Sequence, residues 1–386
     1  MPGGESRASS SAQGRVHLGS LRVFFDTQAF RHQSYGGISR YYAELIRRLP
    51  SLDVSPVMHL PWVDNEHAIA AGLSSHKGAA TLSAHPILRW LYYSALSGHD
   101  MLRSAIDPYD ILHRTYYAAP VPVRRPSVCT VVDMIPELLP HYFPEGNPHR
   151  RKRDVVMASD LVLSISESTT RDVLQFYGYP ASRVVTTPLG IDCQAFADRP
   201  KVGHPFRPPY VLFVGLRHRY KNFRRFGLAA SAVLAAHPEV SLALVGGGAL
   251  LENEREIFVR AGVLDRVVQA NVADEALPSI YREAEVFVFP SEYEGFGLPI
   301  LESFACGCPV AASRASSFPE VGGPAIEYFD PASTDEIAQA IERVLRSRSH
   351  ADELRRLGSE RVKAYSWQRT AELTAQAYHR LSALHA

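Results

Sequence analysis

Apolar runs of strand length alternate along the chain with longer segments in which apolar and polar residues recur at helical spacing. Leu21–Phe25 is the first such run, and Ile38–Leu49 has helical periodicity after the loop Tyr35-Gly-Gly37. A second series of the same kind starts at Tyr210. This alternation is typical of parallel sheets covered by helices on both faces. The segments predicted as strands after the first are residues 110–113, 127–131, 161–164, 183–186, 210–214, 242–245, 267–270, 286–289 and 310–312.

Several helices are marked by the residues that cap them. Ser166 is suited to the N-cap of a helix that runs to about Tyr177, and Gly178 is suited to end it. Late in the chain the periodicity predicts further helices over Ser333–Arg346 and Ala351–Ala364. A last helix, opened by an N-cap serine, is predicted over Ser366–Leu384.

The two alternating series are separated by residues 194–209, where Pro, Gly and charged residues occur without periodicity. We interpret this stretch as a linker, and the length of 386 residues fits two domains of about 100–200 residues each. The chain is therefore predicted to be an α/β protein with two doubly wound, Rossmann-like domains facing a cleft. The predicted division is a disordered tail 1–19, a first domain 20–193, the linker 194–209, a second domain 210–365 and a C-terminal helix 366–386.

Composition excludes several classes of protein. The formal net charge of +1 and pI of about 7.8 do not suit a dedicated nucleic-acid binder. No stretch reaches the ~18–20 apolar residues of a membrane span, and the polar first 20 residues lack the apolar core of a signal peptide. Cys306-Gly-Cys308 is spaced too closely for a usual zinc pair. We expect the cysteines to be small buried residues that stay reduced, as in a cytoplasmic protein.

The strongest motif lies between Phe289 and Pro309. A predicted strand ends there, a glycine-containing loop with Glu294 follows, and Pro299 is suited to the first turn of a helix that carries Glu302. Helix N-termini bind phosphate, and two carboxylates at such an end accept hydrogen bonds from vicinal hydroxyls of a ribose or hexose. A glycine-rich turn followed by an acidic first turn is the structural alternative.

These residues also carry a resemblance to a known family. Glu294 and Glu302, with Glu-Gly-Phe-Gly-Leu-Pro starting at Glu294, resemble the motif of family-4 glycosyltransferases. The resemblance continues through Ser316–Gly322 and Tyr328–Pro331 and extends more weakly into the first domain. It implies the GT-B fold, in which the active site lies between two Rossmann-like domains, with a C-terminal helix returning to the first domain.

The resemblance also implies roles for single residues. Glu302 would hold the ribose of a sugar nucleotide, and Glu294 would contact the donor sugar. The backbone of Phe296, Gly297 and Leu298 would meet the sugar and the distal phosphate.

Cations follow the first strand of the second domain. Arg217, Arg219 and Lys221 stand after the predicted strand 210–214, where fixed positive charge would stabilise a departing diphosphate. Lys221 matches the family's lysine. The family often has Arg directly after the glycine where this chain has Leu216, so Arg217 or Arg219 must supply that charge, and we favour Arg219. A solvated basic loop is the alternative.

The first domain supplies weaker matches. Gly36 and Gly37 are similar to the glycine loop with which the family approaches the diphosphate, although a plain turn would have the same residues. Many relatives have His-Asp where this chain has Val132-Asp133, so one expected active-site group is missing. Asp133 is the remaining catalytic candidate, and a structural Asp that caps the following loop is the alternative.

Three further residues are assigned to the acceptor side. His113 ends a predicted strand, and Glu137 and His141 lie near Asp133 in sequence. A lone histidine at a strand end is more often a hydrogen-bonded structural residue, so that alternative stays open for His113.

Together these features predict a retaining glycosyltransferase that moves a hexose from a sugar nucleotide to a saccharide or lipid-linked saccharide. The segment Tyr35-Gly-Gly-Ile-Ser-Arg40 resembles bacterial mannosyltransferases of polysaccharide assembly. This resemblance favours GDP-mannose as the donor. No Asp-x-Asp occurs, so we expect no cofactor and no required metal. A lipid-linked acceptor would bring the protein to the inner face of a membrane as a peripheral protein.

Other functions stay open. A sugar-nucleotide epimerase of the same fold would need no acceptor, and a non-catalytic sugar-nucleotide binder would tolerate the loss of the histidine. A dinucleotide oxidoreductase is disfavoured because Val245–Leu251 has Leu251 where the third glycine of its fingerprint would stand.

Overall fold

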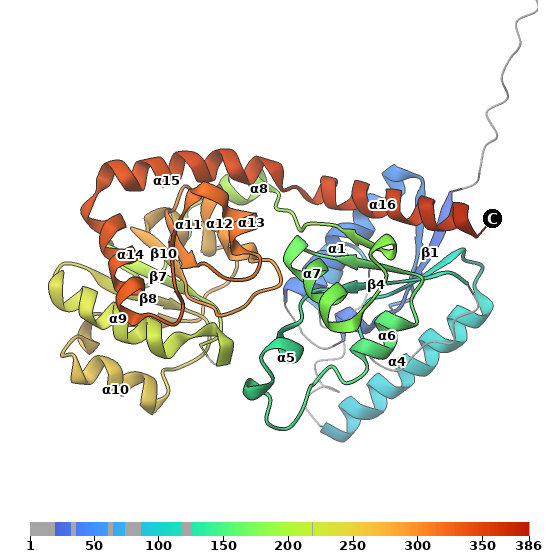
Figure 1. The fold of residues 1–386 in the computed structure, drawn as a ribbon, viewed down its shortest axis with the longest axis horizontal. Helices are drawn as coiled ribbons and strands as arrows, with labels where there is room; N and C mark the ends of the chain where they lie inside the picture. The colour runs from blue at the N-terminus through green and yellow to red at the C-terminus, as the bar shows by residue number, and fades with distance from the viewer. Residues whose placement is uncertain are drawn as a thin grey trace, which may run out of the picture.

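The structure is a computed structural model that describes residues 20–31, 36–60, 65–73, 86–117, 125–217 and 219–385. The predicted tail 1–19 and Tyr35 lie outside the described residues. The chain forms two parallel sheets of six strands each, flanked by helices (Figure 1). This is the predicted pair of doubly wound domains.

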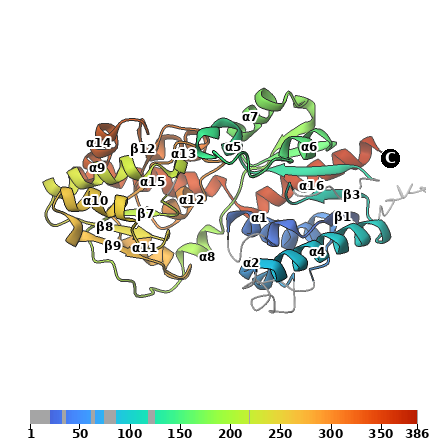
Figure 2. The same cartoon turned by 90° about the horizontal axis from the view of Figure 1, so that it is seen from below.

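The first sheet has the order β2-β1-β3-β4-β5-β6, and every pairing in it is parallel. Its strands are β1 (Leu21–Phe25), β2 (Val54–Val57), β3 (Ile111–Arg114), β4 (Ser127–Val131), β5 (Leu161–Ser164) and β6 (Val184–Thr186). Its helices are α1 (Gly37–Arg48), α2 (Glu66–Ala70), α4 (Pro86–Ile106), α5 (Ile135–Leu138), α6 (Lys152–Met157) and α7 (Glu167–Tyr177). Figure 2 shows α1, α2 and α4 on one side of this sheet and α6 and α7 on the other.

The second sheet has the order β12-β11-β10-β7-β8-β9. Its strands are β7 (Tyr210–Val214), β8 (Ser241–Val245), β9 (Val267–Ala270), β10 (Val286–Phe289), β11 (Val310–Ser313) and β12 (Ile326–Phe329). The helices are α8 (Cys193–Ala197), α9 (Phe223–Ala236), α10 (Glu252–Arg260), α11 (Leu277–Glu283), α12 (Leu298–Ala305), α13 (Phe318–Gly322), α14 (Thr334–Arg346) and α15 (Arg348–Arg361). The strand order reverses direction between β7 and β10, and ligands of such sheets bind beyond the strand ends at this point.

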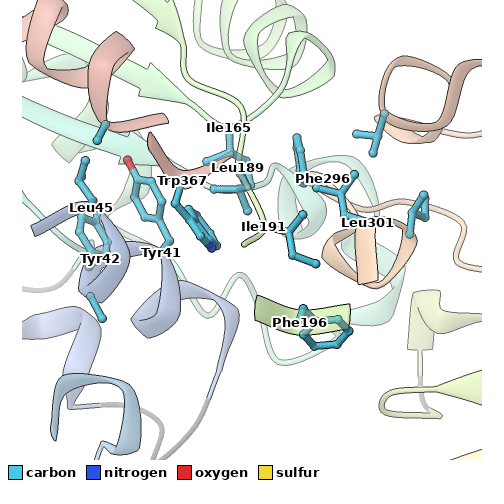
Figure 3. Close-up of a cluster of buried hydrophobic side chains, with 14 of the residues drawn as sticks. Tyr41, Tyr42, Leu45, Ile165, Leu189, Ile191, Phe196, Phe296, Leu301 and Trp367 are labelled. Carbon is cyan, nitrogen blue, oxygen red and sulfur yellow. The ribbon is translucent and has the colours of Figure 1, made fainter. Parts of the chain in front are cut away.

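Helix α16 (Trp367–Leu384) returns from the second domain and packs on α1, as predicted (Figure 1). The predicted N-cap is in place, because the Ser366 hydroxyl accepts from the N–H of Arg369. Near this crossing, apolar side chains from both domains form one buried cluster, with Trp367, Ile191 and Leu301 close together (Figure 3). The domains are therefore joined by apolar packing as well as by the chain.

Candidate active site

The motif found in the sequence lies where the second sheet reverses its strand order. The loop after β7 carries Lys221, and the loop after β10 carries Glu294, so the neighbouring strands bring the two side chains together. Lys221 Nζ lies 2.6 Å from Glu294 Oε1, and Ser291 Oγ donates to the same oxygen at 2.7 Å. These contacts fix the carboxylate, while both charged side chains keep partial exposure.

Helix α12 begins directly after this loop. Gly297 is its N-cap at φ 103°, and a Cβ there would lie 2.9 Å from the ring of Phe318. A side chain at this position is therefore excluded by both backbone and space. Glu302 follows in the second turn, so the two carboxylates flank the helix N-terminus as the sequence indicated. The side chain of Phe296 is buried in the core, which leaves only its backbone to face a ligand.

A second helix N-terminus meets the first. Helix α1 starts after Gly36, and the Cβ position of Gly37 lies 4.0 Å from Leu298 Cδ1 on α12. The first turns of both helices therefore face a common region between the domains. The N-terminal dipoles of both helices favour an anion such as a diphosphate there. In the first turn of α12, Pro299 has no N–H, and the N–H of Ile300 donates to the carbonyl oxygen of Gly297 at 2.9 Å.

Of the arginines after β7, Arg219 is exposed and lies at the interface. Its guanidinium stacks over the ring of Phe143 from the first domain, 4.8 Å from the centroid. Arg219 also has φ 56°, in the left-handed region. The favoured candidate for the diphosphate cation is thus placed between the domains.

The assignment of Arg217 to donor binding is wrong in this structure. Its side chain is buried, and Nε lies 3.1 Å from Glu254 Oε2. The terminal nitrogens donate to the carbonyl oxygens of residues 246–249. All three guanidinium nitrogens are engaged, Nε by Glu254 and the terminal two by the glycine loop after β8, so none is available for a phosphate.

Replacing Arg217 by lysine is therefore expected to destabilise the second domain. Lysine keeps the charge beside Glu254 but cannot span four carbonyls, and a hydrogen bond from a charged group contributes about 1.5–3 kcal/mol. We expect the free energy of unfolding to fall by about that amount in urea titrations. Arg255→Lys, on the neighbouring and exposed surface of α10, is the matched control and should leave it unchanged. Equal stability of Arg217→Lys and the parent would contradict this structural role.

Asp133 lies at the end of β4, against the donor loop. A Cβ on Gly295 would meet the carbonyl oxygen of Val132 at 1.8 Å and Asp133 Cβ at 3.2 Å. Asp133 Oδ1 accepts from the N–H of Ile135 at 3.1 Å, which is the loop-capping contact of the structural alternative. One carboxylate thus both caps the loop and borders the region where the two domains touch.

His113 was assigned to the acceptor side, and the structure contradicts this. The side chain is fully buried, with Nε2 2.9 Å from Thr130 Oγ1 and Nδ1 bonded to the hydroxyl of Tyr378 on α16. Burial lowers the pKa of His113 to about 3, so the ring stays neutral. His113 is a core residue that fastens the returning helix to the first sheet.

Glu137 is held inside the first domain. Its carboxylate accepts from buried Lys152 Nζ at 2.8 Å, from Tyr177 and from Asn147. Burial raises the pKa of Glu137, but the Lys152 ammonium and these hydrogen bonds outweigh it and hold the pKa below its ordinary value. Glu137 is thus a partner of Lys152, which also donates to the carbonyl oxygen of Asp133 at 3.0 Å. Lys152 belongs to a run of basic residues, so the sequence offered no signal for its role.

His141 is exposed, and its ring contacts that of Tyr142 at a centroid distance of 4.2 Å. Tyr142 in turn donates to Glu292 Oε1 at 2.8 Å and so ties this loop to the second domain. His141 therefore stands on a loop that crosses the interface, in a position open to solvent.

Polar contacts between the domains are the main feature that sequence reasoning missed. Arg40 Nη1 lies 2.8 Å from Glu302 Oε1. Glu320 accepts from the N–H groups of Glu167 and Ser168 at the start of α7, each at 2.9 Å. These partners are separated by more than 150 positions, and no local pattern marks them.

Within the described residues, no cluster of three or more His, Cys, Asp or Glu side chains is arranged to hold a metal ion. No helix in the described ranges has the length and apolar character needed to span a bilayer.

Comparison with known families gives two matches that together cover most of the chain. The family model described as "Glycosyl transferases group 1" matches residues 194–361, and "Glycosyltransferase Family 4" matches residues 35–195. The chain is 28% identical to O-antigen chain mannosyltransferase B of Escherichia coli over 93% of this chain and 99% of the relative. It is 32% identical to the MMP alpha-(1->4)-mannosyltransferase of Mycolicibacterium hassiacum over 57% of this chain and 54% of the relative.

Solved structures show the same architecture. Sucrose-phosphate synthase from Thermosynechococcus elongatus superposes with a TM-score of 0.69 at 21% identity, covering 95% of this chain and 100% of that one. Anabaena Alr3699/HepE in complex with UDP and glucose gives 0.67 at 17% identity, covering 92% and 98%. At such identities the likeness establishes the fold.

Proposed function

The chain is a glycosyltransferase of family 4 with the GT-B fold, and we propose that it transfers mannose from GDP-mannose to a saccharide or lipid-linked saccharide. One observation supports the donor site above others. The Lys221–Glu294 pair, Glu302 and the first turns of α1 and α12 converge where the second sheet reverses its strand order. Cations, helix N-termini and carboxylates are the groups that a sugar nucleotide requires.

In the proposed complex the diphosphate lies between the N-termini of α1 and α12. Lys221 and Arg219 neutralise the charge that develops on the leaving diphosphate. Glu302 accepts hydrogen bonds from the ribose, and Glu294, held by Ser291, accepts them from the donor sugar. These fixed charges lead us to propose that no divalent metal is required.

We propose that transfer retains the anomeric configuration. The acceptor hydroxyl attacks C1 of the sugar on the face that the diphosphate leaves, forming the new C1–O bond as the C1–phosphate bond breaks. The hydroxyl proton passes to the departing phosphate oxygen. No carboxylate nucleophile or histidine base is needed on this route, which fits Val132 in place of histidine.

The sugar and the acceptor class are supported by relatives. The similar proteins include an O-antigen chain mannosyltransferase, an alpha-(1->4)-mannosyltransferase and serotype-specific mannosyltransferases. We propose a growing polysaccharide as the acceptor. A lipid-linked form would place the reaction at a membrane surface.

A donor panel tests the proposal. Purified protein is incubated with GDP-mannose, UDP-glucose or UDP-N-acetylglucosamine, and thermal unfolding is followed, since a ligand that binds the native state raises Tm. We expect the largest rise with GDP-mannose. Absence of a shift with all three donors would contradict the donor site, and a shift only with a UDP-sugar would replace GDP-mannose while keeping the reaction. Product analysis with donor alone separates transfer from epimerisation, because only an epimerase converts the sugar without an acceptor.

A further inference from the structure

Arg40 contacts the donor site from the first domain. It lies in the first turn of α1, three residues after Gly37, and its Nη1 is 2.8 Å from Glu302 Oε1 on α12. Only 18% of the Arg40 side chain and 10% of the Glu302 side chain are exposed. This largely desolvated ion pair therefore joins the two helices whose N-termini face the proposed diphosphate position.

The surroundings of Glu302 are acidic. Burial and the neighbouring carboxylates of Glu302 and Glu275 raise the pKa of Asp274 to about 7. The second oxygen of Glu302 accepts from the Tyr281 hydroxyl at 3.4 Å, a contact without charge. Within the part of the chain that the structure describes, Arg40 is the one basic side chain in an ion pair with Glu302. It thus compensates the charge of this carboxylate from across the domain interface.

Binding of a ribose at Glu302, as in the proposed function on which this step rests, has a consequence for Arg40. Arg40 and Tyr281 contact the two oxygens of the Glu302 carboxylate, which leaves little of it exposed. Ribose hydroxyls therefore reach this carboxylate only when the Arg40 guanidinium moves away. A guanidinium with so little exposure needs another anion. The diphosphate of the same donor, at the first turn of the helix that bears Arg40, is that anion, and a guanidinium fork matches phosphate oxygens.

We infer that Arg40 is a further donor-binding residue, which exchanges the Glu302 carboxylate for the donor's diphosphate when the ribose binds. The exchange leaves neither side chain without a partner, because the ribose hydroxyls donate to Glu302 and the diphosphate accepts hydrogen bonds from Arg40. It also requires both domains, since Arg40 and Glu302 stand on different ones. Donor binding is thereby coupled to domain contact.

Arg40→Met and Arg40→Lys test this exchange in the full-length protein. GDP binding is measured by isothermal titration, and guanosine binding by ligand-observed NMR titration. If the donor panel shows that a UDP-sugar is the donor, UDP and uridine replace GDP and guanosine. Loss of one charged hydrogen-bonding group should weaken GDP binding by about 10–100-fold in Arg40→Met. Guanosine binding should be unchanged or stronger, because its ribose no longer competes with Arg40. Arg40→Lys, which keeps the charge, should bind GDP with intermediate affinity.

Arg47→Met is the matched control, since Arg47 lies on the exposed side of the same helix and pairs with Glu44. It should bind GDP like the parent. Unchanged or tighter GDP binding in Arg40→Met would overturn the inference. Equal losses of affinity for GDP and guanosine would also overturn it, because Arg40 would then only position Glu302. If the parent protein bound neither GDP nor UDP, the proposed function itself would fail. That outcome is distinguishable because it appears before any substitution.

Discussion

Replacing Gly295 by alanine is expected to reduce glycosyl transfer at least about a hundredfold, the loss that a misplacement of about 1 Å in an active site can cause. A Cβ at this position would lie 1.8 Å from the carbonyl oxygen of Val132, and real Cβ contacts below 3.0 Å are essentially never seen. Val132 belongs to the other domain. The new methyl group therefore holds the donor loop away from the strand end that bears Asp133.

The effect should be largest on kcat and smaller on nucleotide binding, because Lys221 and Glu302 remain in the second domain while Arg40 and the first turn of α1 belong to the first domain. Steady-state kinetics with the preferred donor and isothermal titration with its nucleoside diphosphate separate the two quantities. Gly203→Ala is the control, since no atom outside its neighbours lies within 4 Å of the added Cβ and Gly203 is exposed. A Gly295→Ala enzyme as active as the parent would show that the contact between the domains is not part of the active state.

Lys221→Met should lower kcat by about 10²–10³-fold, the usual cost of removing one group that stabilises charge in the transition state. Its ammonium is 2.6 Å from Glu294 and follows β7, at the strand end where the diphosphate is proposed to depart. Methionine preserves the length and much of the volume of the side chain. The substitution therefore removes charge with little change in packing.

Transfer assays at saturating donor measure this loss, and circular dichroism checks that the variant is folded. Lys201→Met is the control, because Lys201 is 77% exposed and, among the described residues, its one ion pair is with partly exposed Glu283 at 3.5 Å. We expect Lys201→Met to retain parental kcat. Retention of parental kcat by Lys221→Met would remove this lysine from the proposed chemistry.

Most of the fold was predictable because buried parallel strands are continuous apolar runs. The inner strands β4, β5, β7 and β10, and β1 beside the edge, begin and end at the predicted residues. The half-buried edge strand β9 was also predicted with its exact bounds, because its sequence starts with two valines. The two strands that were missed, β2 and β12, are both at sheet edges. β2 contains Pro56 and β12 contains Glu327, and edge strands accept such residues because one side of the strand needs no partner.

Helix ends were predictable where a side chain caps them. Ser166 accepts from the N–H of Thr169, and Gly178 ends α7 with φ 65°. The residues predicted as a linker begin with the short helix α8, which Asp192 caps and which was not expected there. A five-residue helix has too few turns for its periodicity to stand out in a sequence.

The motif at α12 was recognisable because its glycines, proline and carboxylates lie close together in the chain. The choice between Arg217 and Arg219 was harder, since two arginines with the same charge differ only in where the backbone directs them. Arg217 turns inward to the carbonyls after β8, and Arg219 turns toward Phe143 of the other domain. Sequence spacing contains no information on either partner.

The contacts of His113 and Arg40 could not be predicted from the sequence for the same reason. His113 bonds to Tyr378, and Arg40 bonds to Glu302, across separations of 265 and 262 positions. Such contacts depend on how the returning helix and the two domains are arranged. Without aligned homologues, no pattern within one sequence connects residues so far apart.

Titration of GDP into the parent protein and into Glu302→Gln tests the donor site most directly. Glutamine keeps the size of the side chain but removes the charge that strengthens its hydrogen bonds to the ribose. We predict that the parent binds GDP and that Glu302→Gln binds it at least about tenfold more weakly. Equal affinity of the two proteins for GDP would contradict the placement of the donor nucleotide at α12.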